Sequence, residues 1–503
     1  MSSGGSVDVL QRKQTMGTVA CERWIDTVIK EDEFARYLDD GKDFIDDGAI
    51  EGHLCRNRNP EPHQIRDILD RALSLQRLDP HETATLLNVQ DEELWEEMFE
   101  TAGQIKSRVY GPRIVTFAPL YCSNLCVNSC LYCAFRKENE AEERRRLTLD
   151  EIREETRAVV SVGHKRLIVV YGEHPDSDIN YIADTIRTIY DTRVGSGEIR
   201  RVNINAPPQS VANYKVLKDI GIGTYQVFQE TYHHETYRKV HPPGIKAHYQ
   251  WRLYALHRAQ EAGVDDVAIG ALFGLYDWKF EVMGLLYHTI DLEEKFGGVG
   301  PHTISFPRLE PAANTPLSLN SPYKVSDKDF KRLVAVIRLS VPYTGMIITA
   351  REPAEIRRDV INVGCTQTDA STRIGVGAYS ESYEAQQAER QQFVLGDTRS
   401  LDEVTRELAQ MGYLTSFCTA GYRCGRTGSY FMSIAKKGKV HQFCIPNAIL
   451  TFKEYLLDYS SEETRRIGEE LIEKRMDDIP ENIRPVLRAR IEAIENGARD
   501  LRF

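Results

Sequence analysis

Cysteine is the residue type whose spacing in this chain points most directly to chemistry. The chain has ten cysteines, and Cys122, Cys126, Cys130 and Cys133 lie within 12 residues of one another. Three thiolates spaced as Cys126-x3-Cys130-x2-Cys133 can hold three corners of an iron–sulfur cube and leave the fourth iron open. Structural zinc is the alternative, with Cys122 as a fourth thiolate, but zinc ligands usually come in two well-separated pairs. The spacing therefore favours a 4Fe-4S cluster held by Cys126, Cys130 and Cys133.

A second group of cysteines lies near the end of the sequence. Cys418, Cys424 and Cys444 fall within 27 residues. The glycines at 421 and 425 would let the backbone between the first two cysteines bend freely. We expect a metal or a cluster at this site, and inert packed thiols are the alternative.

Length, charge and apolar content limit the class of the protein. At roughly 100–200 residues per domain, 503 residues provide for two to four domains, although α/β barrels can be larger. The formal net charge of −11 argues against nucleic-acid binding by phosphate neutralisation. No run approaches about 18 apolar residues, and residues 1–30 lack the apolar segment of a secretory signal. We therefore expect a cytoplasmic protein that binds neither nucleic acid nor membrane.

Apolar periodicity predicts a barrel in the middle of the chain. The pattern is helical to about residue 110, and we expect the first 15 or so residues to be disordered. From Ile114 onward, short apolar runs alternate with amphipathic helical segments. This alternation predicts an α/β fold, a parallel (β/α)8 barrel of the TIM type. The runs expected as strands are RIVTFAPLY, RLIVVYGE, RRVNINAPP, TYQVFQE, DVAIGALFG, HTISFPRL, GMIITARE and IGVGAYS.

The pattern changes again after about Tyr383, where charged helical segments return. We expect a helical N-terminal segment over 1–110, the barrel over 111–383, and a mostly helical, cluster-binding domain over 384–503. Barrel active sites lie at the C-terminal ends of the strands. Several of the expected strands end there in polar or charged residues: Glu173, Asn205, Glu230, Arg308 and Arg351.

The segment CVNSCLYC resembles the C-x3-C-x2-C motif of the radical SAM superfamily, and it directly follows the first expected strand. The resemblance implies that S-adenosylmethionine (SAM) chelates the open iron and is cleaved to methionine and a 5′-deoxyadenosyl radical. It also implies an acidic motif after the second strand that holds the methionine amine, and Gly172-Glu173 occupies that place. Tyr132 would lie near the adenine. The cofactor-binding residues expected on this basis are Tyr132, Gly172, Glu173, Arg201 and Glu230.

Longer segments, among them GEHP, RRVNINAPP and YTGMIITARE, resemble the aromatic amino-acid lyase branch of that superfamily. This branch includes the tyrosine lyases of FeFe-hydrogenase maturation and the 2-iminoacetate synthases of thiamine biosynthesis. The resemblance implies cleavage of the Cα–Cβ bond of L-tyrosine to p-cresol and dehydroglycine. In the maturases, onward conversion to carbon monoxide and cyanide for the hydrogenase H-cluster follows. The partners implied are an electron donor such as a ferredoxin or flavodoxin, and other hydrogenase maturases.

Tyrosine as a substrate requires a fixed cation for its carboxylate, and arginine can bind a carboxylate with two parallel hydrogen bonds. Arg351, with Thr349 beside it, matches the substrate-carboxylate arginine of the lyase family. A salt bridge at the barrel mouth is the alternative role for Arg351.

The second cysteine group departs from the family pattern. The maturases bind an auxiliary cluster with C-x2-C and a third cysteine downstream, and a histidine binds a labile iron. Cys418 and Cys444 match, whereas Gly421 occupies the place of the second cysteine. Either Cys424 substitutes in a rearranged loop, or the cluster is altered or lost. The metal ligands expected here are Cys418, Cys424, Cys444 and His302, with His288 and Asp291 as alternatives to His302.

This departure leaves two alternatives to the complete reaction. One is a lyase that stops at dehydroglycine or uses another amino acid. The other is a non-enzymatic protein that uses its cysteine sites as an iron–sulfur scaffold.

Overall fold

The centre of the protein is a closed barrel of parallel strands. The structure, a computed structural model, describes residues 24–381 and 391–503, so the expected disorder of the first 15 or so residues lies outside it. Each strand pairs with the next around the barrel, and the last pairs with the first. The predicted (β/α)8 barrel is thereby confirmed. Its strands are β1 (Arg113–Ser123), β2 (Arg166–Tyr171), β5 (Arg201–Asn205), β6 (Tyr225–Gln226), β7 (Val267–Gly270), β8 (Thr303–Ser305), β9 (Gly345–Ile348) and β10 (Gln367–Asp369).

The eighth strand lies earlier in the chain than expected. The segment IGVGAYS was expected to form it, but its residue Val376 makes only an isolated bridge to Tyr121, and the strand is β10. This strand was missed because it is polar. The Gln367 side chain accepts a hydrogen bond from Arg166 at 2.9 Å and donates one to Thr303 at 3.2 Å. Polar partners inside the barrel therefore replace the apolar residues that usually mark a buried strand.

Helices surround the barrel, and several have the predicted signals. The helix α7 begins with the expected capping box, in which Glu151 N donates to Thr148 Oγ1 at 3.3 Å and Thr148 N donates to Glu151 Oε2 at 2.7 Å. The surrounding helices are α7 (Leu149–Ser161), α8 (Ile179–Asp191), α9 (Val211–Ile220), α12 (Ala255–Glu261), α13 (Trp278–Lys295), α15 (Asp327–Ser340) and α16 (Ala354–Val363). Shorter elements between them are the hairpin β3 (Arg193–Val194) and β4 (Gly197–Glu198), and the helices α10 (His234–Val240), α11 (Tyr249–Leu253) and α14 (Pro316–Asn320).

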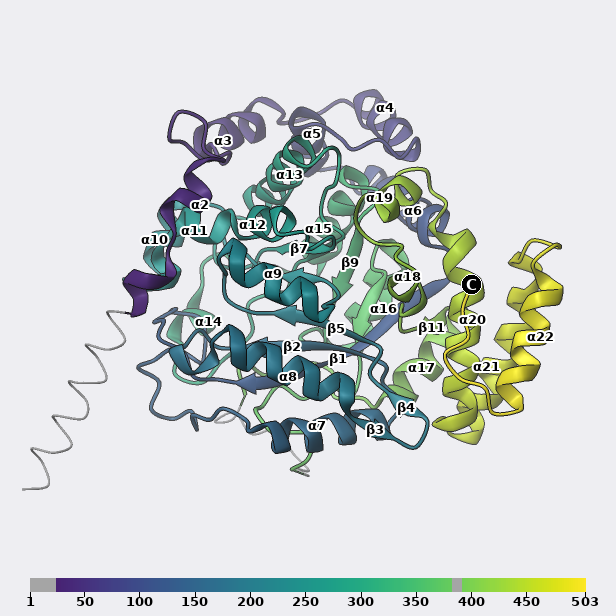
Figure 1. Cartoon of the computed structure of the whole chain (residues 1–503). Coiled ribbons are helices and arrows are strands. Elements are labelled where there is room, and N and C mark those ends of the chain that lie inside the picture. The colour runs from purple at the N-terminus through teal and green to yellow at the C-terminus, as the bar shows by residue number, and fades with distance from the viewer. Residues whose placement is uncertain (1–23, 382–390) are drawn as a thin grey trace, which may run out of the picture.

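The chain before the barrel is helical and packs on its outside (Figure 1). These helices are α2 (Glu31–Ala35), α3 (Asp47–Arg56), α4 (Pro62–Leu73), α5 (Pro80–Leu87) and α6 (Glu92–Tyr110). The longest, α6, packs against α15 and α16. Its Lys106 is buried and donates a hydrogen bond to the carbonyl oxygen of Ile361 at 2.5 Å.

The chain after the barrel is mostly helical, as expected, and one short strand attaches it to the barrel. The strand β11 (Leu414–Ser416) pairs in parallel with the first residues of β1, so that Arg113 lies opposite Leu414. This pairing places the residues that follow β11 at the N-terminal end of the barrel. The helices of this region are α17 (Leu401–Gln410), α18 (Ala420–Arg423), α19 (Gly428–Ala435), α20 (Val440–Asp458), α21 (Glu462–Arg475) and α22 (Arg484–Glu495) (Figure 1).

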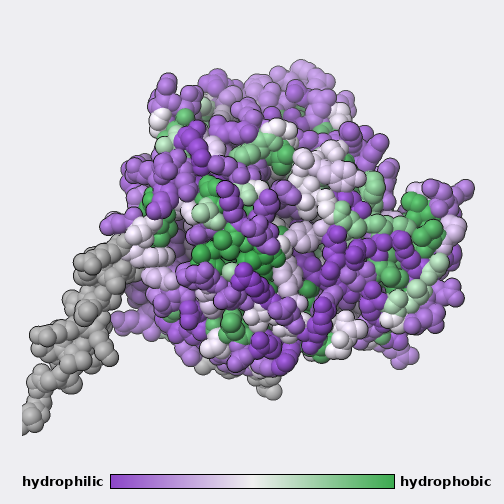
Figure 2. All heavy atoms as spheres, viewed as in Figure 1, coloured by the Kyte–Doolittle hydropathy of each residue, from purple (hydrophilic) through white to green (hydrophobic). Residues whose placement is uncertain are grey.

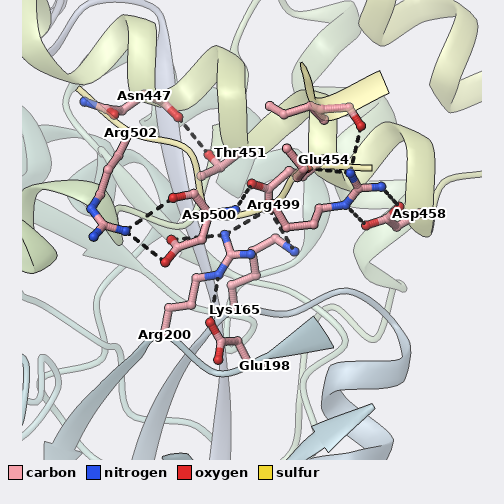
Figure 3. A network of polar contacts seen from close by, with 12 residues as sticks. Lys165, Glu198, Arg200, Asn447, Thr451, Glu454, Asp458, Arg499, Asp500 and Arg502 are labelled. Carbon is pink, nitrogen blue, oxygen red and sulfur yellow. Dashed lines mark hydrogen bonds and ion pairs between the residues drawn. The ribbon is translucent and has the colours of Figure 1, made fainter. Parts of the chain in front are cut away.

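A buried ion network joins α20 to the barrel (Figure 3). Glu454 of α20 is fully buried and lies 2.9 Å from Arg200 and 3.6 Å from Lys165, which precede β5 and β2. Burial, together with nearby Arg200, lowers the pKa of Lys165 to about 8. Asp500 adds a second carboxylate at 3.6 Å from Arg200. The network therefore holds the last residues of the chain, α20 and the barrel together.

Replacing Glu454 with glutamine should lower the free energy of unfolding by about 3–5 kcal/mol, because two buried cations lose a shared carboxylate. Urea denaturation followed by circular dichroism measures the change. Glu463→Gln is the matched control, since its pair with Arg406 at 2.9 Å is exposed and is worth at most about 1 kcal/mol. Equal losses in the two variants would contradict a structural role for the buried network.

The surface seen in Figure 2 is mostly hydrophilic, and its apolar side chains form separate patches. Within the described residues, no helix is both long enough and apolar enough to cross a membrane.

Candidate active site at the barrel mouth

The three cysteines of the CVNSCLYC segment follow the C-terminal end of β1. The loop is fixed against the end of β2, because Val127 N donates to the carbonyl oxygen of Glu173 and Gly172 N donates to that of Ser123, both at 2.8 Å. A Cβ atom at Gly172 would lie only 2.1 Å from the carbonyl oxygen of Leu125. Only glycine therefore allows the loop to approach β2 this closely.

The thiols of Cys126, Cys130 and Cys133 form one electrostatic group. Burial, and to a smaller extent the thiolates of Cys133 and Cys126, raise the pKa of Cys130 to about 12, although nearby Lys246 lowers it. Bound metal ions remove such protons and compensate the negative charge. Three thiols on one loop fit the ligand set of a 4Fe-4S cluster with an open iron.

Cys122 does not belong to this group. It is fully buried, and the neighbours that affect its pKa are Tyr171 and Glu155 rather than the other three thiols. The zinc alternative required Cys122 as a fourth ligand, so the arrangement favours the cluster.

Glu173 offers a buried carboxylate beside the cysteine loop. One oxygen, Oε2, accepts a hydrogen bond from Asn128 at 2.5 Å. The other, Oε1, is buried without a hydrogen-bond partner among the described residues, and burial raises the pKa of the carboxyl group. A buried acceptor without a partner is costly, and a cationic group placed there would relieve that cost. Glu173 thus fits the role expected from the sequence, a ligand for the amine of SAM.

Cys133 of this loop borders a cavity of about 170 Å³ at the C-terminal ends of the strands. Glu173 contacts the same loop through Asn128 but is not among the residues that line the cavity. Tyr132 lies in its wall, with its hydroxyl 2.7 Å from His241 Nε2. Glu230 also lines the cavity and pairs with Lys246 at 2.8 Å and Arg252 at 3.3 Å. Its φ of +72° is a strained conformation for a residue other than glycine, and such strain is concentrated at functional sites.

Arg351 and Thr349 line the same cavity, just after β9. The guanidinium of Arg351 lies 3.3 Å from the ring centroid of Phe393, and burial lowers its pKa. The salt bridge at the barrel mouth is made instead by Arg308, which pairs with Glu352 and with Asp327. Arg351 is therefore placed where it can bind an anionic group of a ligand.

Cys418 and Cys444 meet at the opposite, N-terminal end of the barrel. They line a small cavity of about 20 Å³ together with Arg113, Arg426 and Gly421. Three neighbouring strands, β1, β2 and β5, each begin with an arginine at this end: Arg113, Arg166 and Arg201. Burial alone would raise the pKa of Cys418, but these three arginines lower it overall.

Cys424 does not line this cavity. It is exposed, and its Sγ lies 3.6 Å from the backbone oxygen of Phe503. Gly421 takes the position facing the cavity, and a Cβ atom there would meet nothing within 4 Å. The described arrangement thus brings together the thiols of Cys418 and Cys444. The thiol of Cys424 could join them only if the loop between Cys418 and Cys424 moved.

Two other predicted residues belong to this lower end. Arg201 does not border the upper cavity; its Nη1 lies 3.8 Å from Cys418 Sγ and its Nη2 lies 3.2 Å from Asp266. His302 Nδ1 lies 3.3 Å from the same aspartate. The alternatives to His302 lie in α13, where they contact other residues: His288 contacts Tyr232 and Asp291 contacts His257.

Comparison with known proteins agrees with this geometry. Residues 120–283 match the model of the Radical SAM superfamily, and residues 305–414 match that of the Biotin and Thiamin Synthesis associated domain. A crystal structure of HydG, described as a maturase of the [FeFe]-hydrogenase, shares 51% identity over 92% of this chain and 100% of its own, with a TM-score of 0.88. The chain belongs to the HydG family of radical SAM enzymes.

Other relatives extend this family assignment. HydG from Carboxydothermus hydrogenoformans is 39% identical over 88% of this chain and 97% of its own, with a TM-score of 0.76. The 2-iminoacetate synthase of Salmonella typhimurium is 29% identical over 68% of this chain and 88% of its own. Membership of the radical SAM superfamily implies a 4Fe-4S cluster and SAM, and the three thiols and Glu173 provide groups suited to both.

Some residues of the site could not be found from the sequence. Lys246 lines the cavity, and His241 and Arg252 contact its lining residues Tyr132 and Glu230. All three are brought there by the fold and lie outside the motifs. Gln392 and Phe393 also line it, from the segment after the last strand. The apolar run Phe393-Val394-Leu395 was the one available signal, and it is too short to be specific.

Replacing Glu173 with glutamine should weaken SAM binding by about 30-fold or more, because the amine loses a buried charged partner. Equilibrium dialysis of the iron-loaded protein measures the dissociation constant. Asp176→Asn, which changes an exposed acid three residues away, should bind SAM as the unmodified protein does. Unchanged binding by the Glu173 variant would remove this residue from the SAM site.

Proposed function

We propose that the protein is a radical SAM lyase that cleaves the Cα–Cβ bond of L-tyrosine to p-cresol and dehydroglycine, in FeFe-hydrogenase maturation. The observation that carries the proposal is the placement of Arg351 in the same cavity as Tyr132 and Cys133 of the cysteine loop, a loop that Glu173 contacts through Asn128. The relatives named HydG and 2-iminoacetate synthase support it. An electron donor such as a ferredoxin or flavodoxin, and other hydrogenase maturases, are the proposed partners.

Different residues of the site bind different chemical groups. When bound, the 4Fe-4S cluster and SAM supply a 5′-deoxyadenosyl radical. Glu173 holds the ammonium group of SAM, and Arg351, in the cavity, holds the carboxylate of tyrosine.

The decisive experiment is anaerobic incubation of the iron-loaded protein with a reductant, SAM and tyrosine, followed by chromatography for p-cresol. Arg351→Lys should lower kcat/KM for tyrosine by about 10- to 100-fold, because lysine cannot form the two parallel hydrogen bonds. Deoxyadenosine formation without tyrosine should persist in this variant. Arg466→Lys, at an exposed position of α21, serves as the control.

Two results would reject the proposal. SAM cleavage without any p-cresol would exclude a tyrosine lyase. Deoxyadenosine formation that survives in Cys130→Ala would exclude the cysteine loop as the cluster site, whereas its loss excludes a purely non-enzymatic scaffold.

A second candidate function is a lyase that stops at dehydroglycine and makes no carbon monoxide or cyanide. The observation that favours it is the position of Gly421, which faces the lower cavity where a third thiol is needed, while Cys424 is exposed. Two converging thiols are fewer than the three that the second cluster of the predicted domain requires. The onward steps to carbon monoxide and cyanide depend on that cluster.

Gly421→Cys tests the second candidate. The added thiol should raise the iron content by about one cluster per chain, because it completes a set of three. Iron analysis with EPR measures this, and a haem trap reports carbon monoxide. Cys418→Ala should abolish the gain. Carbon monoxide from the unmodified protein would show instead that Cys424 completes the site, and would reject the truncated reaction.

A further inference from the structure

Residues 391–397, which we name the strap, cross the mouth of the upper cavity. Three alternate side chains of the strap, Phe393, Leu395 and Asp397, are buried, whereas Val394 between them is 44% exposed. Gln392, Phe393 and Leu395 line the cavity together with Arg351. From Phe393 onward the buried and exposed side chains of the strap alternate, as they do in an extended strand, and Gln392 before it also reaches the cavity.

The strap is anchored to the segments that follow β8 and β9. Val394 N donates to the carbonyl oxygen of Pro311 at 3.0 Å, and Gly396 N donates to that of Ala350 at 2.8 Å. Asp397 forms a buried ion pair with Arg357 of α16 at 2.5 Å. A Cβ atom at Gly396 would lie 2.4 Å from the carbonyl oxygen of Arg351, so the strap runs directly against the backbone of that arginine.

Gln392 connects the strap to the cysteine loop. Its Nε2 donates a hydrogen bond to Cys133 Sγ at 3.6 Å, and its Oε1 accepts one from the Tyr121 hydroxyl at 2.9 Å. A thiolate can only accept a hydrogen bond, so it favours the amide with its N–H group toward the sulfur and its oxygen toward the Tyr121 hydroxyl. The N–H group thus points at a thiol proposed to hold the cluster.

Phe393, the next residue, acts on the substrate side of the cavity. The guanidinium carbon of Arg351 lies over the Phe393 ring, 3.3 Å from the centroid of that ring. Stacking on an aromatic ring limits the positions of a guanidinium while leaving its N–H groups free to donate.

We propose that the strap is a positioning element for both halves of the reaction, in which Gln392 tunes the cluster through Cys133 and Phe393 holds Arg351 for the substrate carboxylate. The role of Gln392 depends only on the 4Fe-4S cluster that the family implies. The role of Phe393 rests also on the proposed function, because it concerns the binding of tyrosine.

The expected effect of Gln392 is on reduction potential. A hydrogen bond to a cluster thiolate stabilises the more negative, reduced state and raises the potential. Gln392→Leu removes the donor, and Gln392→Glu replaces it with a group of the same shape that accepts and carries negative charge. Both should shift the potential to more negative values, and the glutamate variant should shift it further.

EPR-monitored redox titration of the iron-loaded protein without substrate measures this shift. Iron content equal to that of the unmodified protein confirms that each variant holds its cluster. Gln104→Leu, the same change at an exposed position of α6, is the matched control. An unchanged potential in both Gln392 variants would overturn the cluster half of the proposal, whatever the substrate proves to be.

Phe393→Leu tests the substrate half. Loss of the stacking contact should raise KM for tyrosine by about threefold or more, and Phe393→Tyr should restore it, because its ring can stack equally well. The cluster potential should stay the same in both variants. An unchanged KM in Phe393→Leu would overturn this half, whereas failure to form p-cresol in the unmodified protein would reject the proposed function and leave the potential measurements valid.

Discussion

The hydrogen-bonded register of β1 is the constraint on which both ends of the molecule depend. Residues 118–123 pair with β2, residues 115–117 with β10, and residues 113–115 with β11. The strand leads at one end into the cysteine loop and begins at the other end with Arg113, beside Cys418. Because side chains alternate along a strand, a shift of one residue in β1 would displace both groups of thiols at once.

The two ends of the barrel differ in their charge, and this difference suits different occupants. At the upper end, Arg351 lines the cavity with its guanidinium, and Glu173 has a buried carboxylate oxygen beside the cysteine loop. These two groups complement the carboxylate and the ammonium groups of amino-acid moieties. At the lower end, Arg113, Arg166 and Arg201 begin three adjacent strands beside Cys418. Several buried cations next to thiols favour an anionic occupant.

The sequence predicted what depends on local pattern and failed where distant segments meet. The barrel and the loop around Cys126 follow from periodicity and from spacing within a few residues. The position of β10 did not, because Gln367 gains its partners Arg166 and Thr303 only inside the closed barrel. Arg201 was assigned to the cofactor by resemblance, although the expected strand RRVNINAPP already placed it at a strand start, and the structure puts it at the lower end. Resemblance to family motifs suggested a role for each site residue. The structure shows at which end of the barrel each of these residues lies.

The alternation within the strap also restricts its length. Phe393 faces Arg351 and Asp397 faces Arg357, and exactly three residues separate the two contacts. Insertion or loss of one residue between them would leave one contact intact and turn the other side chain to the outside. Substitution at the exposed position 394 leaves this spacing intact, whereas a change in length does not. Relatives that share this arrangement should therefore vary in sequence along the strap while keeping its number of residues.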